Sequence, residues 1–156
     1  MKIGVPKEIK PQENRIGLTP DSVKTLISQG HEVLIENNGG FEAGFDNEQY
    51  KSAGAKIIDK AEDIFNESEI IVKVKEPQSN EVKMIRENQI VFTYLHLAAA
   101  KELTQGLIKS KGICIAYETV TDENGRLPLL APMSAVAGRM SVQAGAHCLE
   151  KNQKGR

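Results

Sequence analysis

The sequence predicts an α/β fold, with a mostly parallel sheet and helices on both faces. Three observations carry this prediction. Short apolar runs alternate with segments of helical spacing, which is typical of parallel sheets. The runs are rich in β-branched residues, as buried parallel strands are. Helix start and stop signals separate them. The predicted strands fall at residues 3–5, 31–36, 56–58, 69–75, 89–96 and 113–118.

The first strand leads into a long charged loop. Pro6 stops the strand, and residues 7–19 follow with neither a strand nor a helix pattern. Loops longer than about 12 residues are often functional in compact domains. Thr19 and Pro20 then give an N-cap and a first-turn proline, and the helix ends at Gly30. Its inner stripe consists of apolar residues three and four apart, Val23, Leu26 and Ile27.

The glycines after the second strand predict a turn and not a phosphate cradle. They stand at positions 39, 40 and 44 and do not spell G-x-G-x-x-G. Asp46 caps a short helix that runs through Ala53. Further helices are expected near residues 61–66, 80–87 and 101–111. We therefore predict a Rossmann/flavodoxin-like domain without the glycine-rich turn that binds NAD.

The last part of the chain contains a turn, a long helix and a polar tail. Residues 122–125 form the turn, and Ser134 is expected to cap a helix from 135 to about 149. The tail, residues 151–156, resembles a linker. The predicted organisation is one domain over residues 1–150 followed by this linker stub.

Composition excludes several classes of protein. A formal net charge of −1 argues against nucleic-acid binding, which favours a basic excess. The N-terminus has no signal-peptide pattern, and no apolar run approaches the ~20 residues that span a bilayer. Cys114 and Cys148 are predicted to be reduced, buried core residues of a cytoplasmic protein. No Cys or His has the spacing of a zinc site, so no metal is expected.

Charged residues from distant parts of the chain are expected at one edge of the sheet. Arg15 follows the first strand, and Lys75, His96 and Glu118 end three later ones. The carboxyl ends of parallel strands form the ligand crevice of open α/β sheets. Arg15 could bind a carboxylate, Lys75 could polarise a carbonyl, and His96 could transfer a proton. Together these groups suit a small keto acid or amino acid.

Each of these residues also has a purely structural explanation. Arg15 could be a solvated loop charge, and Lys75 could pair with Glu76 or Glu118. Glu118 is expected to orient a neighbour, not to react. His96 could simply hydrogen-bond the following turn. These alternatives stay open from the residues alone.

Several long blocks strongly resemble the alanine dehydrogenases, in one register from the first residue to about Leu149. The blocks are Ile3-Gly4-Val5-Pro6-Lys7-Glu8-Ile9-Lys10 with Glu13-Asn14-Arg15, Lys73-Val74-Lys75-Glu76-Pro77, Phe92-Thr93-Tyr94-Leu95-His96-Leu97-Ala98, Ala116-Tyr117-Glu118-Thr119-Val120, and Leu127-Pro128-Leu129-Leu130-Ala131-Pro132-Met133-Ser134 with Ala137-Gly138-Arg139-Met140.

The resemblance implies a reversible, NAD-dependent oxidative deamination of L-alanine to pyruvate and ammonia. It implies that Arg15 and Lys75 bind the substrate, that His96 is the proton donor and acceptor, and that Ser134 contacts NAD. It also implies a hexamer, and an NAD-binding domain beyond Arg156 that this chain lacks. The fragment alone is then expected to be inactive and to expose apolar surface.

Two other functions stay open. The first is the related first domain of a proton-translocating NAD(P) transhydrogenase, which has the same fold but needs no acid-base histidine. The second is a non-catalytic module that binds a keto acid. The block from Tyr94 to Leu97 favours the dehydrogenase.

Overall fold

A computed structural model describes residues 1–155, and within them the chain divides into two compact units. The first unit is Met1–Ala116, and the second begins at Tyr117. The domain boundary that the sequence suggests at residue 150 stays a prediction.

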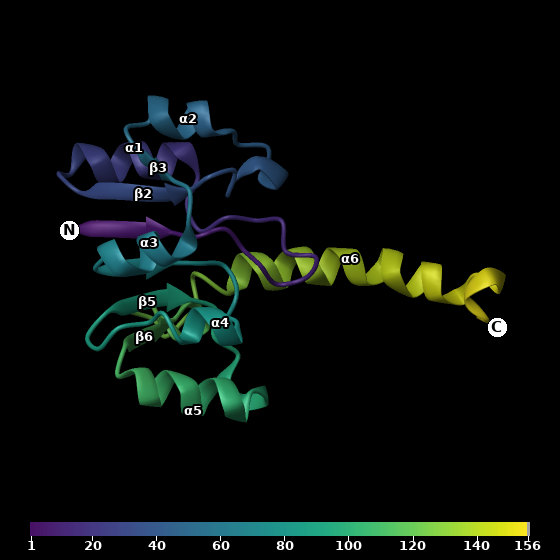
Figure 1. The fold of residues 1–156 in the computed structure, drawn as a ribbon. Helices are drawn as coiled ribbons and strands as arrows, with labels where there is room; N and C mark the ends of the chain where they lie inside the picture. The colour runs from purple at the N-terminus through teal and green to yellow at the C-terminus, as the bar shows by residue number, and fades with distance from the viewer. Residues whose placement is uncertain (156) are drawn as a thin grey trace. The chain divides into compact units, whose positions relative to one another are not determined.

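The first unit contains six parallel strands in one sheet (Figure 1). Their order is β3-β2-β1-β4-β5-β6, which is the doubly wound order of Rossmann folds. The predicted α/β class is therefore confirmed. Because β1 and β4 are neighbours, the direction of winding reverses between them. The strands are β1 (Lys2–Val5), β2 (Glu32–Glu36), β3 (Lys56–Ile58), β4 (Ile70–Val72), β5 (Ile90–Thr93) and β6 (Ile113–Ala116).

Two helices cover one face of the sheet, over β1, β2 and β3. Helix α1 (Pro20–Ser28) begins as predicted, with the Thr19 hydroxyl accepting from the Ser22 N–H at 3.3 Å. Helix α2 (Asn47–Ser52) has a capping box built on Asp46. Tyr50 of α2 is fully buried and donates its hydroxyl to the Leu18 carbonyl at 2.9 Å. The buried residues of this face are Ile3, Val5, Val23, Val33, Ile35, Tyr50, Ala55 and Val72.

Three helices cover the opposite face. They are α3 (Ala61–Glu67), α4 (Ser79–Val82) and α5 (Lys101–Ser110). Side chains alternate across a strand, so Leu34 lies on this face while Val33 and Ile35 lie on the other. The buried residues here are Leu34, Ile64, Phe65, Ile71, Ile85, Val91, Leu95 and Leu107.

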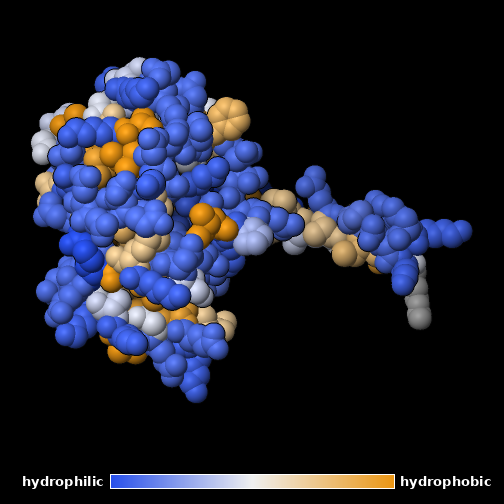
Figure 2. Space-filling view, in the orientation of Figure 1, coloured by the Kyte–Doolittle hydropathy of each residue, from blue (hydrophilic) through white to orange (hydrophobic). Residues whose placement is uncertain are grey.

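The outer strand β6 leaves apolar side chains in solvent. Cys114 and Ala116 pack on the α5 side, whereas Ile113 and Ile115 point the other way and are 48% and 41% exposed. The view in Figure 2 is mostly hydrophilic over the first unit, with apolar patches between the polar side chains. Exposed apolar surface, which the resemblance implied, is therefore present on this unit.

Several predicted bounds were wrong. The fourth strand ends at Val72 and not at 75, although the Lys73 N–H still donates to the Phe92 carbonyl at 3.1 Å. The sixth strand ends at Ala116, and Glu118 lies in the 3₁₀ turn η3 (Tyr117–Thr119). Helix α4 ends at Val82 and not at 87. The 3₁₀ turns η1 (Phe41–Ala43) and η2 (Leu97–Ala99) complete the first unit.

The second unit is built around one long helix. Helix α6 (Ala131–Leu149) begins four residues earlier than predicted, because Pro132 fits its first turn. Ser134 is consequently inside the helix and is not its N-cap; its hydroxyl donates to the Leu130 carbonyl at 3.3 Å. Cys148 is exposed, so it is not the core residue that the sequence suggested. A 3₁₀ turn, η4 (Lys151–Gln153), follows.

Across residues 1–155, none of the helices combines the length and the apolar character needed to cross a membrane.

Candidate functional site

The candidate site lies at the carboxyl edge of the sheet, where the winding reverses. The segments that follow β1, β4 and β5 meet there, and these strands are neighbours in the sheet. In doubly wound folds this switch point is where ligands bind. Arg15, Lys75 and His96 come from these three segments in turn.

Arg15 and Lys75 act on one carboxylate. Arg15 donates from Nε and Nη2 to the two oxygens of Glu13, at 2.7 and 2.6 Å. These hydrogen bonds, with a smaller contribution from the charge of Lys75, lower the pKa of Glu13 to about 2. The same hydrogen bonding raises the pKa of Arg15, and Tyr94 and Glu8 add to this effect. Arg15 therefore pairs with Glu13, and Lys75 lies within electrostatic reach of that carboxylate.

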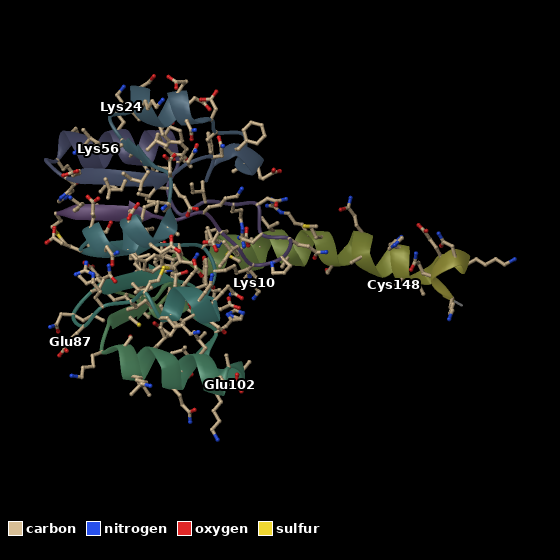
Figure 3. All side chains as sticks on the ribbon, viewed as in Figure 1. Lys10, Lys24, Lys56, Glu87, Glu102 and Cys148 are labelled. Atoms are coloured by element: carbon tan, nitrogen blue, oxygen red, sulfur yellow. The ribbon has the colours of Figure 1, made fainter. Side chains whose placement is uncertain are left out.

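Glu76 pairs with a different lysine. Its carboxylate accepts from Lys10, which lies on the loop after β1 (Figure 3). Burial acts to raise the pKa of Glu76, but the Lys10 hydrogen bond and the charge of Lys75 lower it overall. Lys75 therefore contributes charge beside both Glu13 and Glu76, and Lys10 bonds directly to Glu76.

His96 lies beyond the end of β5 in an unusual backbone conformation. Its φ and ψ are 53° and 36°, in the left-handed region, and it precedes the 3₁₀ turn η2. A non-glycine residue in this region costs roughly 1 kcal/mol or more, and such strain often occurs at functional sites. The side chain is exposed at the edge of the sheet. The prediction that His96 ends the fifth strand was therefore wrong, because β5 ends at Thr93, three residues earlier.

A buried ion network beneath these residues was not foreseen from the sequence. Lys73 Nζ contacts Glu8 Oε2 at 3.1 Å and Glu81 Oε1 at 2.8 Å. The three side chains are 0%, 2% and 3% exposed. A lysine flanked by Val72 and Val74 at the end of an apolar run was the available signal, because a charge so placed needs buried partners.

The other two predicted residues belong to the second unit. Ser134 lies in α6, and Glu118 lies in η3. Their roles at the site stay predictions.

The first unit does not fit the pyrophosphate of a dinucleotide at its switch point. Such a group needs free N–H donors at the start of the helix after β1. There Pro20 has no N–H, the Ser22 N–H is bonded to Thr19, and Asp21 adds a negative charge. Gly17 is no phosphate cradle either, because a Cβ there would lie 2.6 Å from the Val72 carbonyl oxygen.

Among residues 1–155, no group of three His, Cys, Asp or Glu side chains is placed to hold a metal ion. A groove of about 800 Å³ lies between α4 and α5, with Val82, Ile85 and Leu103 in its wall. Arg15, Lys75 and His96 do not line it, and the charged groups gather instead at the switch point.

Comparison with known proteins gives a family. A family model described as "Alanine dehydrogenase/PNT, N-terminal domain" matches residues 4–137. This chain belongs to that family. The resemblance seen in the sequence is thereby confirmed.

The similar proteins are longer than this chain. The alanine dehydrogenase of Halomonas elongata is 52% identical over 155 residues, which cover 99% of this chain and 42% of that protein. A solved L-alanine dehydrogenase matches 100% of this chain and 43% of its own, with a TM-score of 0.91 and 53% identity. The transhydrogenase from Sinorhizobium meliloti matches 76% of this chain and 35% of its own, with a TM-score of 0.71 and 25% identity. This AlaDH/PNT N-terminal domain therefore spans less than half the length of these relatives.

Proposed function

We propose that this chain is the substrate-binding domain of an NAD-dependent alanine dehydrogenase. The reaction converts L-alanine, NAD and water to pyruvate, ammonia and NADH, and it is reversible. The observation that carries the proposal is that Arg15 bonds Glu13 at the switch point while the charge of Lys75 acts on the same carboxylate. Two cations so placed suit a small anionic ligand.

The proposed roles follow from the chemistry of each group. Arg15 binds the substrate carboxylate, for which a guanidinium offers paired donors. In the structure Arg15 donates from Nε and Nη2 to the carboxylate of Glu13, which shows the paired mode of binding proposed for the substrate. Lys75 donates to the keto oxygen of pyruvate, which is the oxygen that water adds to the α-carbon during deamination. Negative charge develops on this oxygen. His96 exchanges the proton of that oxygen or of the attacking water.

The cofactor is proposed to be held mainly outside this chain. NAD accepts the hydride when it is bound, and the relatives have more than half of their length beyond the matched region. Ser134 is the residue of this chain proposed to contact it. The full-length protein is proposed to be a cytoplasmic homo-oligomer, a hexamer as in its family, without nucleic-acid or membrane partners.

Calorimetry with pyruvate tests the proposed site. We expect binding by the 156-residue chain and at least a tenfold weaker affinity for Arg15→Ala, because a charged hydrogen bond to a carboxylate is lost. The matched control is Lys51→Ala, which removes an exposed cation paired with Glu48 on α2. Equal affinity in Arg15→Ala and Lys51→Ala would contradict the proposal.

An activity assay tests the proposal that the cofactor is held mainly outside this chain. We expect no NADH formation from L-alanine and NAD by the 156-residue chain. Sustained NADH formation would show that the chain is a complete enzyme. If longer forms of the protein also bind pyruvate but form no NADH, the result would instead support a non-catalytic keto-acid module.

The transhydrogenase alternative rests on the weaker of the two structural matches, at 25% identity against 53%. Reduction of one nicotinamide nucleotide by another, without any pyruvate binding, would support it.

A further inference from the structure

The backbone at Lys75 lies beyond the regular part of the sheet. Strand β4 ends at Val72, so the segment that carries Lys75 follows the last regular strand residue. Its position must come from other contacts if Lys75 is to present its side chain in one place.

Glu8 supplies the first of these contacts. Its Oε1 accepts from the Val74 N–H at 2.6 Å and from the Lys75 N–H at 3.3 Å. Glu8 lies on the loop after β1, so this carboxylate joins the two strands on either side of the switch point. Hydrogen bonds to an ionised acceptor are about twice as strong as neutral ones.

Lys73 and Glu81 hold Glu8 in turn. Lys73 Nζ bonds the second oxygen of Glu8, at 3.1 Å, and also bonds Glu81 at 2.8 Å. Glu81 accepts from the Gln78 N–H at 2.7 Å through its other oxygen, which ties α4 to the network. Because these side chains are at most 3% exposed, water cannot replace their partners.

Strand β5 closes the arrangement from the other side. The Thr93 hydroxyl donates to the Lys75 carbonyl at 2.9 Å, and the Tyr94 N–H donates to the Val74 carbonyl at 3.3 Å. Both the N–H and the carbonyl of Lys75 are therefore bonded, and the charge of its side chain acts on Glu13 and Glu76.

We propose that Glu8 is a positioning residue for Lys75. Its carboxylate, oriented by Lys73, fixes the backbone from which Lys75 reaches the ligand. The ligand part of this inference rests on the proposed function of Lys75. The positioning part concerns the backbone alone.

Three conservative variants separate positioning from general stability. Glu8→Asp keeps the charge but shortens the side chain, so it cannot reach both Lys73 and the two amides. Glu8→Gln keeps an acceptor for the amides but loses the charge opposite Lys73. Glu81→Gln, the matched control, removes the other charge from Lys73, keeps the acceptor for the Gln78 N–H and leaves Glu8 in place.

Amide hydrogen exchange at Val74 and Lys75 is the first measurement. The free energy of unfolding of each variant is measured by urea titration, and its exchange rates are judged against that value. In Glu8→Asp we expect both amides to exchange about tenfold faster than in the wild type, the effect of one lost charged hydrogen bond. In Glu8→Gln and Glu81→Gln we expect rates within about threefold of the wild type, because the Glu8-side acceptor is retained.

Pyruvate affinity is the second measurement. We expect Glu8→Asp to bind about fivefold more weakly, and the two Gln variants to bind within about twofold of the wild type. Unchanged exchange in Glu8→Asp overturns the proposal, as does equal loosening in Glu81→Gln. Faster exchange with unchanged affinity overturns it too, because Glu8 would not then position Lys75 for a ligand. If the wild type binds no pyruvate, the proposed function fails, and amide exchange alone decides whether Glu8 fixes the backbone.

Discussion

Two clusters of charge lie at the same edge of the sheet, and they differ in their access to water. In the lower cluster Lys73 contacts Glu8 and Glu81, and no side chain is more than 3% exposed. In the upper cluster Arg15 contacts Glu13 while its own side chain is 48% exposed. The first cluster can act only on the protein, whereas the second can also meet a ligand.

The difference also decides which cluster stabilises the fold. Breaking a buried pair leaves an uncompensated charge and costs about 3–5 kcal/mol, while an exposed pair contributes about 0–1 kcal/mol. A carboxylate in the buried network can therefore be changed only with care. The Arg15–Glu13 pair, whose side chains are 48% and 7% exposed, lies between these limits, so Arg15 can exchange partners at a lower cost than Lys73.

The largest effect is expected for Lys73→Met. This change keeps the length of the side chain but leaves Glu8 and Glu81 buried without a cation between them. We expect the free energy of unfolding at pH 7 to fall by about 3–5 kcal/mol, measured by urea titration. Adding Glu8→Gln and Glu81→Gln to Lys73→Met should restore part of it. A loss below about 1 kcal/mol would show that the network does not hold the fold.

The second largest effect is expected from lowering the pH, which acts on the pair of Arg15 with Glu13. The pKa of Glu13 is about 2 in the folded chain against an ordinary value of 4.5, so its contribution to stability is complete above pH 4.5. That contribution is lost as the pH falls from 4.5 through 2. Solvent screens the half-exposed Arg15, so we expect about 1–2 kcal/mol to be lost. Urea titrations of the wild type and of Glu13→Gln over this range should converge at low pH; parallel curves would contradict the assignment.

A smaller effect, and one of opposite sign, is expected for His96→Gly, which should stabilise the fold. The left-handed backbone at His96 suits glycine, so the change should raise the free energy of unfolding by about 0.5–1 kcal/mol while removing the proposed proton-transfer group. Lys111→Gly is a matched control, because Lys111 also has a positive φ, of 58°, at the end of α5. Thermal denaturation measures both variants. Destabilisation by His96→Gly beside stabilisation by Lys111→Gly would show that the imidazole holds the fold.

The smallest effect is expected for Glu87→Ala. Its pair with Lys111 joins side chains that are 60% and 67% exposed. We expect the free energy of unfolding to change by less than about 0.5 kcal/mol in urea. A change as large as that of Lys73→Met would remove the distinction between exposed and buried pairs.

Much of the fold could be predicted because local patterns determine it. Thr19 and Pro20 start α1, Asp46 caps α2, and Lys56–Ile58 is a strand with the bounds that the sequence suggested. These signals act within a few residues. The start of α6 was missed because two helix-start signals compete there, and Pro132 prevails over Ser134.

The candidate site could be predicted only in outline. Strand ends placed Arg15, Lys75 and His96 at one edge, because parallel strands share a direction. The pair of Arg15 with Glu13 and the network of Lys73 depend on side-chain packing between distant segments, which spacing does not encode. A lysine among valines was visible in the sequence, but its two partners, Glu8 and Glu81, could not be chosen from several nearby acids.

The contact between Glu8 and Lys73 also bears on how the chain folds. The two residues are 65 positions apart, and β2 and β3 lie between them in the sequence. Contacts of long sequence separation form slowly, because the loop between them must close first. The backbone at Lys75 should therefore be among the last parts of the sheet edge to become ordered. A chain that has assembled only one side of the switch point would have its local helices and strands but not the proposed anion site.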